Sequence, residues 1–149
     1  MAVSVAARQA SRERVLQLLY GLNITGNDWE EDLDDSFEWD PADGEVRKYS
    51  RILLGGIAEH REALDARILA SLRGWTPERV GKIEMALLQL GAFEMLYSND
   101  VPAKVAINEC LELAKRYAPD GATTFVNGVL DRLMHEQTDT PEVQDEANA

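Results

Sequence analysis

The sequence has a single cysteine, Cys110, among its 149 residues, and only two histidines, His60 and His135. One cysteine excludes an intramolecular disulfide and a zinc site built on paired cysteines, and it fits a reducing cytosol. The histidines lie in neither a His-x-x-x-His nor a Glu-x-x-His pattern, so no metal site is predicted. We expect Cys110 to be buried, because it lies in the middle of the apolar stripe of its predicted helix.

Long apolar runs and a phosphate-binding loop are also missing. The longest uncharged stretch, 15–27, is too short and too polar to cross a bilayer. The first arginines follow the short apolar start of the sequence, which does not fit a secretory signal. Gly55 and Gly56 lack the flanking strand and the lysine of a phosphate loop, and they predict a close approach between helices instead. We therefore expect a soluble, cytoplasmic protein without membrane association, cofactor or catalytic residues.

Basic residues are in the minority, with 15 lysines and arginines against 27 acidic residues and a net charge of -12. The acidic residues are unevenly distributed, because 10 of them lie in 28–45 and 5 in 136–149, and neither segment has a basic residue. The remaining chain holds 12 acidic and 15 basic residues, a charge of +3. The overall acidity therefore does not exclude an RNA-binding surface.

Alternation of polar and apolar residues is likewise absent, whereas apolar residues recur at spacings of three, four and seven. This pattern predicts an all-α protein, and the length and the apolar content of 45% suit one domain. The predicted helices are 5–23, 45–72 with a break near His60, 83–97, a helix between Pro102 and Pro119, and 122–135.

A helix start signal, an acidic segment and an acidic tail complete the predicted organisation. Thr76, Pro77 and Glu78 form a helix start signal ahead of 83–97, a helix that is apolar on two sides and should run through the middle of the protein. We interpret the acidic residues at about 25–45 as a loop, in which Trp29, Leu33 and Phe37 would allow a short helix. The prediction is thus one helical domain over 1–135 and a disordered acidic tail over 136–149.

The first predicted helix changes character along one face. Arg8 and Arg12 are one turn apart and share the angular position of Val15 and Leu19. Only the apolar half can be buried, so we expect the basic half, with Arg14 beside it, to project beyond the bundle and meet phosphates. The alternative is an ordinary solvated helix end, and charge alone does not separate the two.

Four motifs occur in an order known from one protein family: RQASRE with QLLY at 8–20, KVAINE at 104–109, ELAK at 112–115 and FVNGVLD at 125–131. Over residues 8–133 the sequence resembles the NusB family of bacterial transcription antitermination factors. The resemblance implies two three-helix subdomains packed along a shared N-terminal helix. It also implies pairing with NusE, a small-subunit ribosomal protein, and binding of the pair to single-stranded boxA RNA. That complex would help make RNA polymerase resistant to termination, chiefly on ribosomal RNA operons, with no reaction catalysed.

The resemblance also assigns RNA-binding roles to four residues. Arg8 and Arg12 match the arginine-rich motif of the family and would hold RNA phosphates. Phe125 and Asn127 match residues near the bound RNA. Phe125 also borders the inward stripe of its predicted helix, so a core role stays open beside base stacking.

Tyr20 and Glu84 fall where the family contacts NusE. Asn108 and Glu109 lie off the apolar stripe of their helix, where a structural hydrogen bond or a surface contact would suit them. At Gln9 and at the alanine that follows it, the sequence lacks the arginines that are usual in the family. We therefore expect weak RNA binding in the absence of NusE.

Two other functions stay open. A helical adaptor without RNA specificity would use the acidic segment to bind a basic protein, and it predicts no preference for boxA. A NusB-like domain also precedes some ribosomal RNA methyltransferases, but the sequence shows no Gly-rich cofactor domain, so we do not expect that enzyme. A homodimer also stays open, because monomeric and dimeric members of the family look similar in sequence.

Overall fold

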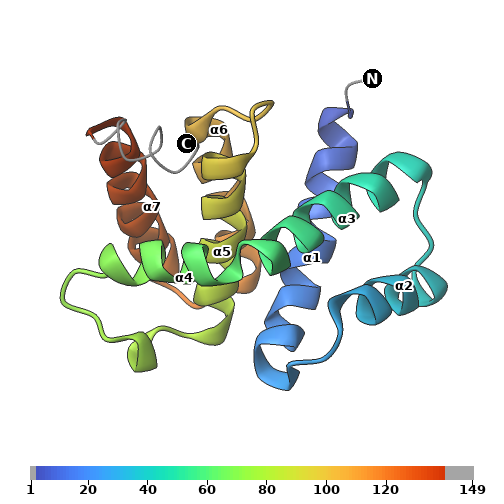
Figure 1. Ribbon diagram of the computed structural model, residues 1–149, viewed down its shortest axis with the longest axis horizontal. Coiled ribbons are helices and arrows are strands. Elements are labelled where there is room, and N and C mark those ends of the chain that lie inside the picture. The colour runs from blue at the N-terminus through green and yellow to red at the C-terminus, as the bar shows by residue number, and fades with distance from the viewer. Residues whose placement is uncertain (1–2, 140–149) are drawn as a thin grey trace.

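The computed structural model describes residues 3–139, with side chains through residue 136 (Figure 1). Its helices are α1 (Val5–Thr25), α2 (Trp29–Trp39), α3 (Gly44–Glu59), α4 (Arg61–Ala70), the 3-10 turn η1 (Pro77–Arg79), α5 (Lys82–Tyr97), α6 (Ala103–Tyr117) and α7 (Ala122–Asp139). The described residues contain no strand, and the all-α prediction is confirmed.

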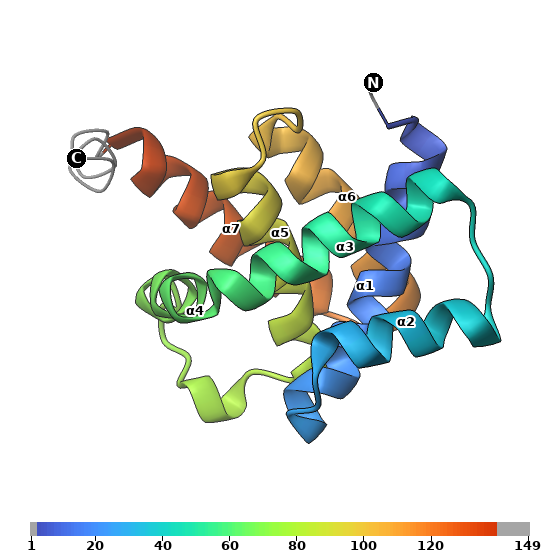
Figure 2. The same cartoon turned by 45° about the vertical axis from the view of Figure 1, so that its right-hand side comes forward.

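The helices form two groups that meet along α1 and α5. In one group α1 packs against α3 and α2, and in the other α5, α6 and α7 pack against one another. The contact between α1 and α5 joins the groups, and α4 reaches both α5 and α7. Figure 1 shows α3 and α4 following each other across the molecule, and Figure 2 shows the bend between them.

The acidic segment that we interpreted as a loop is largely helical, so the short-helix alternative is the correct one. Asp28 caps α2 by accepting a hydrogen bond from the amide of Glu30 at 3.2 Å, and acidic residues in the first turn complement the helix dipole. Leu33 and Phe37, one turn apart, are buried. Burial of these two side chains stabilises a helix that the acidic composition of the segment does not indicate.

The predicted break at His60 is confirmed, since α3 ends at Glu59 and α4 begins at Arg61. The two glycines in α3 do mark close approaches. A Cβ atom on Gly56 would lie 2.2 Å from Cζ of Phe93, and one on Gly55 would lie 2.9 Å from the Trp29 ring. Both positions leave room for side chains of neighbouring helices.

The start signal at Thr76 does not begin the central helix. Pro77 opens only the 3-10 turn η1, and the Thr76 side chain makes no capping hydrogen bond. Val80 is extended and packs against the core, which separates this turn from α5. The helix begins two residues later, at Lys82, with Gly81 as its N-cap.

Helix α5 runs through the middle of the protein, as predicted. All residues from 86 to 95 are buried, including the polar Gln89 and Glu94. Buried polar groups need internal partners. Gln89 donates to Asp65 at 3.0 Å and accepts from the Asn23 amide at 2.9 Å.

Of the last two helices, α6 follows its predicted boundaries and α7 extends beyond its predicted end. Helix α6 lies between Pro102 and Pro119 and buries Cys110, whose thiol pKa is raised by burial, so this cysteine is an unreactive core residue. Helix α7 continues past residue 135, its predicted end, to Asp139. The first part of the predicted tail is therefore helical, and the rest of it, 140–149, lies outside the described residues.

No helix in the described part of the chain has the length and apolar character needed to span a membrane.

Candidate nucleic-acid interface

The basic half of α1 does not project into solvent as predicted. Ser4 caps the helix by accepting a hydrogen bond from the Ala7 amide at 3.1 Å, and Arg8 and Arg12 follow in its first two turns. Arg12 is only 3% exposed. The prediction that the Arg12 side chain projects into solvent is therefore wrong.

Two carboxylates hold Arg12 inside the protein. Its Nε lies 2.8 Å from Oε1 of Glu94, and its Nη1 lies 3.5 Å from Oε1 of Glu109. Glu94 is fully buried in α5, and the Tyr49 hydroxyl donates to its other oxygen. A buried carboxylate is costly without such partners. Arg12 thus faces inward because α5 presents an acid that it neutralises.

Burial and charge both act on this group of side chains. Burial would lower the pKa of Arg12, but the hydrogen bond and the charge of Glu94 raise it overall, so the guanidinium stays protonated. Burial, followed by the charge of Glu94, raises the pKa of Tyr49 to about 12. The Tyr49 hydroxyl therefore remains a donor, and the group forms a satisfied internal network.

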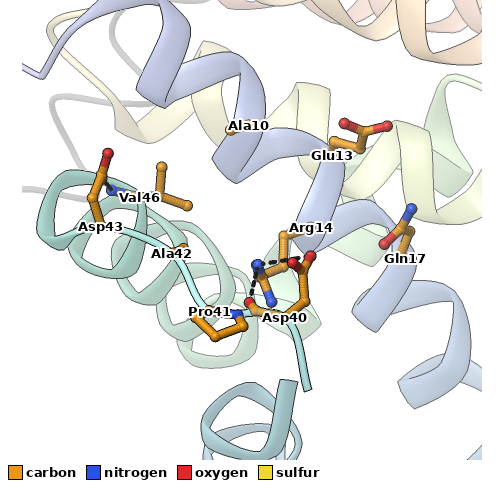
Figure 3. A pocket seen from close by; sticks show the side chains of 9 residues that line it. All are labelled: Ala10, Glu13, Arg14, Gln17, Asp40, Pro41, Ala42, Asp43 and Val46. Atoms are coloured by element: carbon orange, nitrogen blue, oxygen red, sulfur yellow. Dashed lines mark hydrogen bonds and ion pairs between the residues drawn. The ribbon is translucent and has the colours of Figure 1, made fainter. Parts of the chain in front are cut away.

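Arg14 is also occupied, as Figure 3 shows. It donates to the backbone oxygen of Asp40 at 2.7 Å and to the carboxylate of the same residue at 3.2 Å. A further hydrogen bond joins it to the backbone oxygen of Ser36 at 3.0 Å. Arg14 thus fastens α1 to the end of α2, on the wall of a cleft of about 560 Å³ that also contains Glu13 and Asp43.

Arg8 differs from the other two arginines. Its guanidinium lies over the Tyr49 ring, 4.8 Å from the centroid, and its Nη1 has no hydrogen-bond partner among the described residues. It lines a cleft of about 370 Å³, which we call the Arg8 cleft. The main lining residues come from α1, α3, α5 and the loop after α5: Arg8, Lys48, Tyr49, Ile52, Tyr97 and Asp100.

The motif residues of α7 lie elsewhere. Phe125 is half-buried, packs against the core and lies beside Trp75, with 5.0 Å between the ring centroids, whereas Asn127 is exposed. Phe125 lines a second cleft, of about 260 Å³, which we call the Phe125 cleft. Its main lining residues are Trp75, Arg79, Glu84, Asp120 and Phe125.

The structure does not bring Arg8 and Phe125 together. The Arg8 cleft includes Tyr97, the last residue of α5, and the Phe125 cleft includes Glu84, in its first turn. The 16 residues of α5 span about 24 Å. Arg8 and Phe125 therefore lie near opposite ends of α5.

The two residues predicted to contact NusE are partly exposed, as expected. Tyr20 is 42% exposed on α1. Glu84 is half-buried and folds back over Gly81 at the N-terminus of α5, inside the Phe125 cleft. The structure therefore groups Glu84 with Phe125, which we had assigned to a different partner.

Sequence patterns do not predict every residue that lines these clefts. Lys48 and Tyr97 line the Arg8 cleft, and no local pattern marks them because they come from different helices. Glu94 does carry a signal, since an acid inside a continuously apolar helix requires a cationic partner. Glu109 has the structural role that its position suggested, because it pairs with Arg12 and accepts from Gln9 at 3.4 Å. No cluster of three or more metal-ligating side chains occurs in residues 3–136.

Comparison with known proteins places this arrangement in a family. Residues 9–135 match the model of the NusB family. The transcription antitermination protein NusB of Anaeromyxobacter dehalogenans is 38% identical over 131 residues, which cover 85% of this chain and 89% of that protein.

Solved structures show the same fold. The structure of T. maritima NusB superposes with a TM-score of 0.80 at 30% identity and covers 87% of this chain and 91% of its own. A crystal structure of the antitermination factors NusB and NusE with double-stranded RNA gives a TM-score of 0.82 at 23% identity, over 89% of this chain and 99% of that one. From its motifs, its helical arrangement and these matches, the chain belongs to the NusB family.

Proposed function

We propose that this protein is a transcription antitermination factor that binds boxA of nascent ribosomal RNA together with NusE and helps to form a termination-resistant RNA polymerase complex. The observation that carries the proposal is family membership over nearly the whole helical domain, with curated relatives named for antitermination. The protein acts by binding, and we assign no reaction to it. Action on nascent RNA would place it in the cytoplasm.

The RNA-binding role of the first motif belongs to Arg8 in this proposal. Arg8 lines a cleft and has an unsatisfied guanidinium nitrogen, whereas Arg12 is buried in an ion pair with Glu94. Arg12 acts as a positioning residue that fixes the start of α1 against α5. Arg8 then supplies the charge that a single-stranded RNA backbone requires.

The NusE surface would include Tyr20 and Glu84, and it adjoins the Phe125 cleft. Tyr20 lies one turn after Gln17, and the Gln17 side-chain amide donates a hydrogen bond to the Tyr117 hydroxyl at 3.2 Å. Tyr117 is the last residue of α6. Glu84 lines the Phe125 cleft, which includes Asp120 in the loop after α6. Both residues are therefore near the end of α6, and we propose that RNA reaches Phe125 and Asn127 beside NusE.

A binding experiment tests this function. Labelled boxA RNA is titrated with the protein alone and with the protein plus NusE, against a scrambled oligonucleotide. We expect preference for boxA that strengthens with NusE, because the pair would offer a longer surface than either component. Tyr20→Asp and Glu84→Lys should remove the NusE effect while circular dichroism remains that of the wild type.

The same titration distinguishes the alternative function. Equal affinity for boxA and the scrambled RNA in the presence of NusE would contradict the antitermination role and favour a helical adaptor. Retained NusE binding by both variants would contradict only the assignment of the NusE surface.

A further inference from the structure

The Arg8 cleft has the features of a site for part of a larger ligand. It has a volume of about 370 Å³, within the usual range of roughly 300–1,000 Å³ for ligand clefts. Helices α1, α3 and α5 each contribute a side chain to it, namely Arg8, Lys48 and Tyr97. Three packed helices thus form most of its walls, and the loop after α5 completes them.

The cationic side of the cleft is not neutralised from within. Arg8 makes a cation–π contact with Tyr49, but its shielded Nη1 lacks an acceptor, and an unsatisfied buried donor is costly. Lys48 is exposed and has no ion pair within residues 3–136. After a small rotation of the Arg8 side chain, an anion in the cleft would supply the acceptor that the guanidinium lacks. Lys48, which lines the same cleft, would add a second positive charge.

The opposite side of the cleft is aromatic and apolar. The Tyr97 ring stacks on His60 with 4.0 Å between centroids and an interplanar angle of 14°. Tyr97 is nevertheless 41% exposed, and Ile52 is exposed beside it. The Tyr97 ring thus contacts the His60 and Phe93 rings, and its exposed part is accessible to a further flat group from the cleft.

A group that carries both an anion and a flat ring fits these two sides. We infer that the Arg8 cleft binds one nucleotide of single-stranded RNA, with its phosphate at Arg8 and Lys48 and its base against Tyr97 and Ile52. Cationic and aromatic side chains in one cleft are typical of single-stranded RNA sites. This inference rests on the proposed function and adds Lys48, Ile52 and Tyr97 to the RNA surface.

Asp100 at the edge of the cleft opposes a phosphate. Its charge reduces the positive potential of Arg8 and Lys48, so the wild-type site is weaker than its two cations alone would make it. Replacement of Asp100 by asparagine should therefore strengthen RNA binding. A gain of affinity from a conservative change is a result that damage to the fold would not produce.

The experiment measures boxA affinity in the presence of NusE over a salt series. Lys48→Ala should weaken binding and lower the log-log salt slope by about 0.7, because one phosphate contact is lost. Tyr97→Ala should weaken binding by about 5- to 150-fold with little change in slope, which corresponds to the loss of one stacked base. Tyr97→Phe, which keeps the ring, should lose much less affinity than Tyr97→Ala, and Asp100→Asn should bind more tightly than the wild type.

Arg47→Ala is the matched control for Lys48→Ala. Arg47 is the preceding residue of α3, but its guanidinium lies over the Phe37 ring of α2, away from the cleft, so the effect should be much smaller. If wild-type protein prefers boxA but all cleft variants match it, this inference is overturned and the proposed function stands. If the variants lose NusE pairing instead of RNA affinity, the cleft is a protein contact and the inference is also overturned. Wild-type protein without any boxA preference would refute both.

Discussion

Three arginines within two turns of α1 have three different environments. Arg12 is enclosed by Glu94 and Glu109, Arg14 is bonded to the end of α2, and Arg8 alone lies in a cleft with an unsatisfied nitrogen. A guanidinium can serve an internal ion pair, a backbone contact or a ligand, and the surrounding acceptors decide which. Residue type and spacing therefore do not establish that an arginine binds RNA.

Arg12→Ala should destabilise the protein by about 3–5 kcal/mol, because it leaves the buried Glu94 without its cation. Arg8→Ala should cost only about 1 kcal/mol or less, since it removes a cation–π contact at a partly open position. Chemical denaturation of both variants measures these costs. A stable Arg12→Ala variant whose RNA salt slope falls would show that Arg12 binds phosphate directly.

Gly56→Ala should destabilise the protein by about 1–3 kcal/mol despite the better helix propensity of alanine, because the new methyl group would overlap the Phe93 ring. The Phe93 ring stacks on the Tyr97 ring, with 5.7 Å between their centroids, and this contact restricts its movement away from the new methyl group. Gly21→Ala in α1 is the control, since a methyl group there would meet no neighbouring element of the described chain within 4 Å. It should stabilise by about 0.5–1 kcal/mol in the same thermal and chemical denaturation experiments. Equal effects at the two sites would contradict a close approach at Gly56.

At the scale of the element, α2 depends on the rest of the protein. Its sequence is dominated by acidic residues that repel one another, and a helix of 11 residues is marginal alone in water. The Asp28 cap and the burial of Leu33 and Phe37 compensate. Arg14 adds a link from α1, and Arg51 of α3 pairs with Asp34 at 2.7 Å.

Leu33→Ala should therefore loosen α2 selectively, at a cost of about 2–5 kcal/mol if the helix unfolds with the core and less if it detaches locally. Hydrogen exchange of the amides in 29–39 should accelerate more than exchange in α5. Asp35→Ala, at an exposed position of the same helix, should change stability by no more than about 0.5 kcal/mol. Unchanged exchange in α2 of the Leu33 variant would show that the helix forms without docking.

At the scale of the whole molecule, Glu94 connects the two helix groups. Its carboxylate in α5 receives Arg12 from α1 and Tyr49 from α3, and Arg12 in turn reaches Glu109 in α6. Four helices thus depend on one buried network. Such a network favours one arrangement of the groups, because any other leaves a buried charge unpaired.

The network predicts a loss of stability at alkaline pH. The folded state holds the Tyr49 proton more tightly than the unfolded state, with a pKa raised from 10.0 to about 12. The contribution of this group is therefore complete below pH 10 and is lost as the pH rises towards 12, by about 2–3 kcal/mol in total. Denaturation midpoints between pH 9 and 12 should fall less steeply for Tyr49→Phe, with Tyr20→Phe as an exposed control. Parallel curves for Tyr49→Phe and the wild type would contradict the assignment.

Local sequence patterns were sufficient to predict every helix except α2 and to indicate the family. Apolar periodicity placed α1, α3 to α5 and α7, while Pro102 and Pro119 bounded α6, because helix formation and its interruption depend on neighbouring residues. The glycine pair in α3 predicted close packing, and Cys110 was predicted to be core. Four motifs, in the order in which the NusB family carries them, were enough to indicate that family.

Which of the predicted site residues are accessible, and which of them lie together, depends on packing between distant helices. Arg12 pairs with a residue 82 positions away, and Arg8 and Phe125 lie at opposite ends of α5. The docking of α2 and the failure of the Thr76 signal to begin α5 likewise depend on contacts with the core. A periodic pattern shows which face of a helix is apolar, but the partner of a buried charge and the walls of a cleft come from distant helices whose packing the pattern does not encode.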